Sequence, residues 1–134
     1  MPDPVTLVRS PSLSDVAEYA YAASVEPGAR LVFAAGACPL DADGNTVCPG
    51  DHAGQARQVM ANLRVALHDA GAALTDVVKT TVYVASGEQA DLVTVWEVVR
   101  DTFGDHDAPS TLLGVAVLGY TGQLVEVEAV AAVR

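Results

Sequence analysis

The chain has 134 residues, of which 51% are hydrophobic and 18% are charged. This length predicts one domain over residues 1–134, and the apolar fraction is high enough for a packed core rather than a disordered chain. Seven basic against 17 acidic residues give a net charge of −10, so neither nucleic acid nor an anionic membrane surface is an expected partner. The longest apolar stretch, Leu31 to Leu40, is about half a membrane span. Without a signal peptide, and with two cysteines, a cytoplasmic protein with reduced thiols is expected.

The first part of the chain predicts a surface segment followed by two strands. Residues 1–15 are rich in Pro, Ser and Asp and are expected to wrap the surface. Residues 19–25 and 30–37 are both rich in apolar side chains, and residues 26–29 between them contain a Pro-Gly pair. Because Pro-Gly is a strong turn signal, the two apolar runs predict a β-hairpin.

Two helices and a strand are expected in the middle of the chain. Residues 52–70 carry apolar side chains at the i, i+3, i+4 and i+7 spacing of an amphipathic helix, with Asp51 as N-cap and Gly71 as stop signal. The β-branched segment 77–84 predicts a strand. A second helix is expected after Ser86–Gln89, which resembles a capping box. Its apolar face consists of Leu92, Val95, Trp96, Val99 and Phe103.

Residues 111–118 and 123–133 are expected to form the last two strands, which gives the order ββαβαββ. This order predicts an α+β fold with a single sheet and two helices on one face. Apolar side chains alternate onto one face of the last strand, whereas the other face mixes apolar residues with Glu126 and Glu128. Residues 112–118 are apolar on both faces, whereas an open sheet with one face in water alternates more cleanly. We therefore predict a homo-oligomer packed through this second face. The alternative is that residues 1–15 cover this face.

Among the candidates for chemistry, Glu126 and Glu128 are the most suggestive pair. At positions i and i+2 of a strand they share a face, roughly 6 to 7 Å apart. An interface that buries them would suit one carboxylate to general acid or base catalysis, and the alternative is a solvated edge or an intersubunit salt bridge. Cys38 has no identifiable base and is interpreted as a small buried residue. Cys48 and His52 lack a second ligand pair, so no metal site is expected.

Four motifs occur in order along the chain. They are LVFAAGACP at residues 31–39, QARQVMANL at residues 55–63, DVVKTTVYV at residues 76–84 and LVEVEAVA at residues 124–131. Each resembles a motif of the Rid family, which is also called YjgF and, in older usage, endoribonuclease L-PSP. The resemblance extends from about Tyr19 to the C-terminus.

The resemblance implies a chorismate-mutase-like fold and a homotrimer with small-molecule pockets at the subunit interfaces. Active family members hydrolyse reactive imines and enamines, such as 2-aminoacrylate, to 2-keto acids and ammonia, and they need no metal or organic cofactor. By resemblance, the glutamate that positions or activates water is Glu126, and the glycine that shapes the pocket is Gly36. The pocket tyrosine matches Tyr21, with Tyr19 as the alternative.

The family arginine that holds the substrate carboxylate has no match, because Ser110 stands at its position. A serine hydroxyl does not replace a guanidinium that binds a carboxylate through two charge-assisted bonds. No Arg or Lys lies between Arg100 and Arg134. The chain thus resembles the subfamilies that lack this arginine. Another arginine, such as Arg30 or one from a neighbouring subunit, is a candidate replacement.

Two interpretations of function remain open from the sequence. The first is an imine or enamine deaminase, or a related hydrolase, in which Glu126 is the catalytic residue and Tyr21, Gly36 and Ser110 bind the substrate. The second is a non-catalytic trimer that binds a metabolite or a protein partner. A ribonuclease is not expected, since the chain is strongly acidic and its sequence contains no basic patch.

Overall fold

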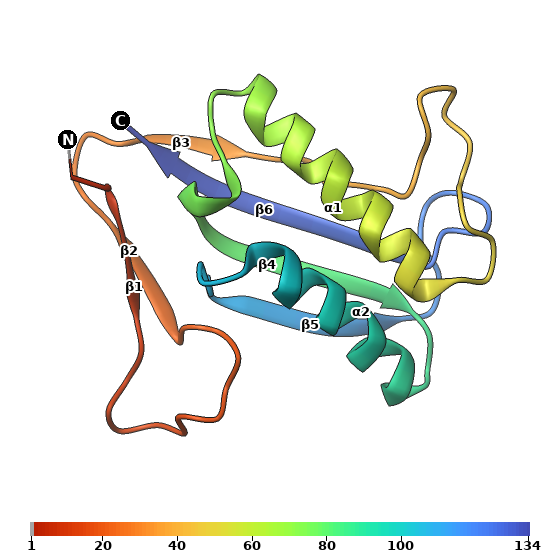
Figure 1. The fold of residues 1–134 in the computed structure, drawn as a ribbon, viewed down its shortest axis with the longest axis horizontal. Coiled ribbons are helices and arrows are strands. Elements are labelled where there is room, and N and C mark those ends of the chain that lie inside the picture. The colour runs from red at the N-terminus through yellow and green to blue at the C-terminus, as the bar shows by residue number, and fades with distance from the viewer. Residues whose placement is uncertain (1) are drawn as a thin grey trace.

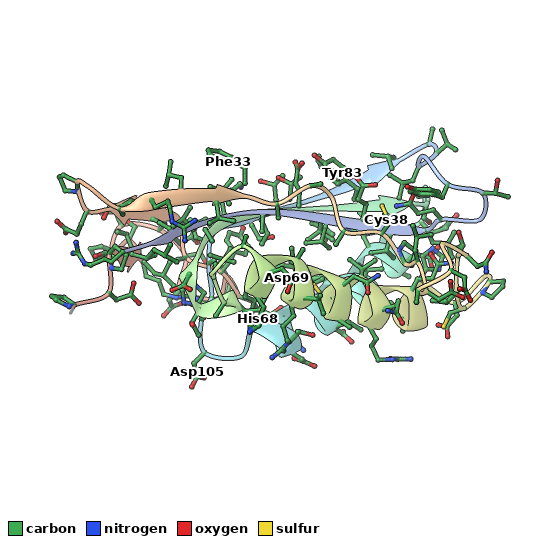
Figure 2. All side chains as sticks on the ribbon, turned by 90° about the horizontal axis from the view of Figure 1, so that it is seen from above. Phe33, Cys38, His68, Asp69, Tyr83 and Asp105 are labelled. Atoms are coloured by element: carbon green, nitrogen blue, oxygen red, sulfur yellow. The ribbon has the colours of Figure 1, made fainter. Side chains whose placement is uncertain are left out.

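Residues 2–134 fold into a four-stranded sheet, two helices and a separate two-stranded ribbon (Figure 1). The computed structural model describes residues 2–134. Its elements are β1 (Val5–Val8), β2 (Ala22–Val25), β3 (Arg30–Phe33), α1 (His52–Asp69), a 3₁₀ turn (Leu74–Asp76), β4 (Val77–Ala85), α2 (Gln89–Phe103), β5 (Ser110–Val115) and β6 (Val125–Val133). The sheet order is β3-β6-β4-β5, in which only the β4–β5 pair is parallel. Both helices cover one face of the sheet, which confirms the predicted α+β class (Figures 1 and 2).

The core lies between the helices and the sheet face that the alternation in β6 predicted. Val125, Val127 and Ala131 of β6 are fully buried. They pack in one cluster with apolar residues of both helices, including Val59, Met60, Leu63 and Leu67 of α1 and Val95 and Val99 of α2. Each fully buried aliphatic side chain of this size stabilises the fold by about 1.5–3 kcal/mol relative to an exposed one.

The two helices begin differently. Asp51 caps α1 as predicted, because its Oδ1 accepts a hydrogen bond from the Gly54 amide at 2.9 Å. The predicted capping box at Ser86–Gln89 is wrong, since α2 begins at Gln89 itself. Ser86 Oγ instead accepts from the amide of Glu88 at 2.9 Å and donates to Asp91 Oδ2 at 2.7 Å. The serine therefore ties the turn that precedes the helix to Asp91 in the first turn of the helix.

The predicted hairpin between residues 19–25 and 30–37 is wrong. β2 pairs with β1, in a register that runs from Val5 opposite Val25 to Val8 opposite Ala22. β3 pairs instead with the C-terminal end of β6. The Pro-Gly turn thus leads from the ribbon into the main sheet. Both partners are distant in sequence, so local turn chemistry did not reveal them. Residues 5–8, which were expected to belong to a surface-wrapping segment, form β1.

The sheet face opposite the helices is open. In Figure 2, Phe33 and Tyr83 project from this face, on the side opposite to His68 and Asp69 of α1. Phe33 is 72% exposed, and Leu31 and Leu113 on the same face are 47% and 42% exposed. The ribbon of β1 and β2 leaves these apolar side chains uncovered. Neither α1 nor α2 has the length and apolar character needed to cross a membrane.

Candidate active site

Glu126, the second residue of β6, lies on the open face beside the loop that follows β3. Its Oε1 accepts a hydrogen bond from Gln123 Nε2 at 3.1 Å and another from Cys38 Sγ at 3.4 Å. A Cβ atom built on Gly36 would lie 2.7 Å from Glu126 Cδ, so the carboxylate fills the space of a missing side chain. Within residues 2–134 no hydrogen bond reaches Oε2. The second oxygen is therefore available to a water molecule or a ligand.

Cys38 acts as a donor to this carboxylate. Burial, the hydrogen bond to Glu126 and the negative charge of Glu126 together raise the pKa of the Cys38 thiol to about 11. A thiol with this pKa is protonated at neutral pH, whereas a cysteine nucleophile or metal ligand has to be a thiolate. Cys38 thus helps to hold Glu126 and is not itself suited to attack a substrate.

The loop that carries Gln123 is held by a buried amide of α1. Gln55 is fully buried, and its Oε1 accepts from the Leu124 amide at 2.7 Å. Its Nε2 donates to the carbonyl oxygens of Gly122 at 3.0 Å and of Cys48 at 3.3 Å. One side chain therefore forms hydrogen bonds with three backbone groups of two loops. These bonds fix the position of the segment that leads into β6 and to Glu126.

Asn62, two turns further along α1, holds the other loop beside Glu126. Its Nδ2 donates to the carbonyl oxygens of Cys38 at 2.8 Å and of Leu40 at 2.9 Å. Gln55 and Asn62 both belong to the motif at residues 55–63, but their role in holding the two loops did not follow from the sequence. Two amides seven residues apart, at the edge of the apolar face of an amphipathic helix, are the sequence signal that could have indicated these positioning residues.

The second carboxylate of the pair has a different environment. Tyr83, on the neighbouring strand β4, donates its hydroxyl to Glu128 Oε1 at 2.6 Å. This hydrogen bond, together with desolvation and the nearby carboxylates, raises the pKa of the Tyr83 phenol. Glu128 thus accepts a single cross-strand hydrogen bond, whereas Glu126 Oε1 accepts two hydrogen bonds and its side chain packs against Gly36. The geometry distinguishes two glutamates that the strand alternation alone treats alike.

Ser110 does not lie beside Glu126 within one protomer. It is the first residue of β5, directly opposite Thr80, whose Oγ1 donates to Ser110 Oγ at 2.7 Å. Thr80 is buried beneath the helices, whereas Glu126 pairs with Tyr83 on the open face. The two candidate residues therefore lie on opposite faces of the sheet. Arg30 does not lie beside Ser110 or Glu126 in the protomer either. Its guanidinium lies 3.4 Å from the carbonyl oxygen of Ala70, at the end of α1.

The structure separates the two candidate tyrosines. Tyr21 donates its hydroxyl to the Ser14 carbonyl oxygen at 2.6 Å and packs edge-on against Tyr19. Tyr19 in turn packs edge-on against Trp96 of α2, with ring centroids 6.2 Å apart. Tyr19, Trp96 and Ser110 line an open hollow of about 510 Å³. Tyr19 rather than Tyr21 is therefore the tyrosine beside Ser110.

The Cys48–His52 pair takes no part in a cluster of ligands. His52 Nε2 faces Asp91 Oδ2 at 3.8 Å, and Cys48 is exposed on its loop. In the part of the chain that the structure describes, no three His, Cys, Asp or Glu side chains gather in a way that suits a metal ion.

Comparison with known proteins places the chain in a family. The family model described as Endoribonuclease L-PSP matches residues 12–133. A RutC family protein of Pyrococcus abyssi is 32% identical over 111 residues, which cover 83% of this chain and 84% of that protein. The rat 2-iminobutanoate/2-iminopropanoate deaminase is 33% identical over 102 residues, which cover 76% of this chain and 72% of that enzyme.

The solved structures agree with the sequence comparisons. YyfB, a Rid-family protein of Yersinia pestis, superposes with a TM-score of 0.90 at 27% identity, over 97% of this chain and 99% of that one. The fold is thus the chorismate-mutase-like α+β fold of the Rid proteins. The chain belongs to the Rid/YjgF family, the family of endoribonuclease L-PSP, as its four motifs predicted.

Proposed function

We propose that this protein hydrolyses small reactive 2-imino acids, and the enamines in equilibrium with them, to 2-keto acids and ammonia. The observation that carries the proposal is the Glu126 carboxylate, which Gln123 and Cys38 hold through one oxygen while the other stays available. Membership of the Rid family and similarity to a rat enzyme named for imine deamination support this substrate class.

The proposed reaction adds one water molecule to the C=N carbon. Glu126 accepts a proton from the water as the new C–O bond forms, the π electrons of the C=N bond move to nitrogen, and Glu126 passes that proton to the nitrogen to give a carbinolamine. In the second step Glu126 accepts the proton of the new hydroxyl group as the C–O bond becomes a carbonyl. The C–N bond breaks, and the nitrogen takes this second proton from Glu126 and leaves as ammonia. General base catalysis of this kind accelerates a reaction by about 10²–10⁴-fold.

We further propose that the site is completed between subunits of a homotrimer. Glu126 and Ser110 lie on opposite faces of the sheet in one protomer, so a small ligand reaches both only across an interface. The exposed apolar side chains of the open face, among them Phe33 and Leu113, support such packing. The trimeric state itself is implied by the family resemblance.

The alternative is a trimer that binds a small molecule without turnover. The observation that favours it is Ser110, which lacks the charge of the family arginine. Ribonuclease activity is not proposed, because a chain with a net charge of −10 opposes a phosphate backbone. A cytoplasmic location remains part of the proposal and is supported by the two free cysteines, Cys38 and Cys48.

A coupled assay tests the proposal. A pyridoxal-phosphate-dependent dehydratase generates 2-aminoacrylate or 2-aminocrotonate, and keto-acid release is followed as the concentration of this protein is raised. We expect the rate of release to rise in proportion to the protein added. A folded oligomer that gives no acceleration, and yet is stabilised against heat by 2-keto acids, would reject the enzyme and support the binding alternative.

A further inference from the structure

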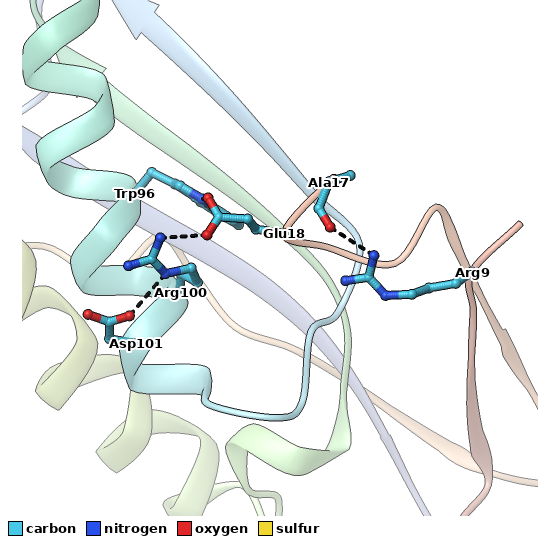
Figure 3. Close-up of polar contacts among 6 residues, drawn as sticks. All are labelled: Arg9, Ala17, Glu18, Trp96, Arg100 and Asp101. Atoms are coloured by element: carbon cyan, nitrogen blue, oxygen red, sulfur yellow. Dashed lines mark hydrogen bonds and ion pairs between the residues drawn. The ribbon is translucent and has the colours of Figure 1, made fainter. Parts of the chain in front are cut away.

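A second polar cluster lies on the helix side of the sheet, away from Glu126. Arg100 and Trp96 are four residues apart on α2, so their side chains project from the same face of the helix. Both contact the carboxylate of Glu18 (Figure 3). Arg100 Nη1 lies 2.5 Å from Glu18 Oε2, and Trp96 Nε1 donates to Glu18 Oε1 at 3.3 Å. The two side chains thus form a fork that binds both oxygens of one carboxylate.

The fork borders the hollow that contains Ser110. Arg100, Trp96 and Ser110 line a narrow cleft in which about 20 Å³ remains free, enough for one water molecule. Trp96 and Ser110 also line the adjoining open hollow of about 510 Å³, which has the size of a small-molecule site. Among the described residues that line the cleft, Arg100 is the one that carries a permanent positive charge.

The contact between Glu18 and Arg100 is easy to exchange. The side chains of Arg100 and Glu18 are 35% and 48% exposed, and ion pairs in such positions contribute about 0–1 kcal/mol. Glu18 belongs to the irregular segment between β1 and β2, so its displacement breaks no helix or strand. Asp101 Oδ1 accepts from Arg100 Nε at 3.0 Å and keeps the guanidinium in place when Glu18 moves.

We infer that Arg100 and Trp96 form the carboxylate-binding site for the ligand, and that Glu18 occupies this site until a ligand carboxylate replaces it. The fork then supplies the cation that Ser110 lacks, from a different element of the fold. The ligand class is a small 2-oxo or 2-imino monocarboxylate, whose remaining atoms fill the hollow beside Tyr19 and Ser110. The identity of this class rests on the proposed function, whereas the binding site itself does not.

Calorimetric titration of the full-chain oligomer with pyruvate tests the inference. We expect Arg100→Gln to weaken binding by about tenfold or more, because the charge-assisted contact to one carboxylate oxygen is lost and only the Trp96 contact to the other remains. Glu18→Gln is expected to tighten binding several-fold, because the competing anion is removed. Arg57→Gln, which removes an equal charge from the exposed face of α1, is the matched control and should leave the Kd unchanged. Pyruvamide, which has no carboxylate, should not respond to Arg100→Gln.

Two results would overturn the inference. The first is pyruvate binding that is equally tight in the wild type, Arg100→Gln and Glu18→Gln. The second is the absence of saturable binding to both the wild type and Glu18→Gln. Turnover in the coupled assay is measured separately, so the two proposals can fail independently. If Arg100→Gln is active with an unchanged KM, the carboxylate-binding role of Arg100 and Trp96 is rejected and the deaminase proposal stands. If pyruvate binding depends on Arg100 but no turnover occurs, the deaminase proposal is rejected and the binding site stands.

Discussion

Glu126 packs directly against Gly36 and occupies the space that any larger residue at position 36 would need. A Cβ atom added to Gly36 would lie 2.7 Å from Glu126 Cδ. The glycine is needed for this close approach rather than for a turn. Because the carboxylate packs directly on the Gly36 backbone, its position depends on the path of the loop after β3. Asn62 of α1 holds that loop through the carbonyl oxygens of Cys38 and Leu40.

Gly36→Ala should therefore reduce catalysis more than stability. The new methyl group displaces the Glu126 side chain from its rotamer, which costs about 0.5–1.5 kcal/mol in folding and moves the carboxylate away from Gln123. We expect turnover to fall at least about tenfold, while the unfolding temperature changes little. Gly87→Ala is the control, because nothing lies within 4 Å of its added Cβ. Equal activity in both variants would show that the placement of Glu126 is unimportant.

Glu126→Gln should abolish most of the turnover without unfolding the protein. The amide keeps the shape of the side chain but cannot accept a proton from water, so a loss of about 10²-fold or more is expected. Glu128→Gln is the matched substitution two residues away, where the carboxylate accepts a hydrogen bond from Tyr83. It should retain most of the activity in the coupled assay. A Glu126→Gln variant as active as Glu128→Gln would remove Glu126 from the mechanism.

Cys38 should react slowly with alkylating reagents. Its pKa is raised to about 11, first by burial and then by Glu126, so at about pH 8 nearly all of the thiol is protonated. In a Cys48→Ser background, mass spectrometry after iodoacetamide treatment reports Cys38 alone. The rate should increase as the pH rises toward 11, and it should increase at constant pH in Glu126→Gln, which removes the negative charge that helps to raise the pKa. A rate that Glu126→Gln leaves unchanged contradicts this contact.

Gln55→Leu should destabilise the fold although the replacement is apolar and similar in size. Three backbone groups lose their partner, including the Leu124 amide and the Gly122 carbonyl oxygen. A group left unsatisfied costs about 1–3 kcal/mol where water cannot replace its partner. Because Gly122 and Cys48 are exposed residues whose carbonyl oxygens water can reach, a total loss of about 3 kcal/mol is expected. Urea denaturation at constant protein concentration measures it, with the exposed Arg57→Ala as a control expected within about 0.5 kcal/mol. A Gln55→Leu variant of wild-type stability contradicts the assigned role.

The parts of the fold that follow from local periodicity could be predicted from the sequence. The spacing of apolar residues located α1 and α2, and the alternation in β6 identified both the core face and the open face that carries Glu126 and Glu128. The pairing of β2 with β1 could not be predicted, because it depends on a partner separated by an irregular segment. The Pro-Gly turn pointed to the nearer but wrong partner.

The site could be predicted only in part. Motif resemblance selected Glu126 and Gly36, which the structure brings together, and Ser110, which it places on the other face. That separation could not be predicted, because residues 112–118 are apolar on both faces and show no alternation that would assign the faces of β5. The choice between Tyr19 and Tyr21 likewise required the position of Trp96 on α2.

We propose above that the active site is completed between subunits, and the activity of a monomeric variant tests this most directly. Phe33→Glu places a charge at an apolar position of the open face that is 72% exposed in the protomer, so trimer packing would bury an unpaired carboxylate. Sedimentation mass and turnover are measured on the same sample. Val65→Glu, at an exposed apolar position on α1, is the control and should remain oligomeric and active. We predict that Phe33→Glu is a folded monomer without turnover, and a folded monomer with wild-type turnover would contradict the account.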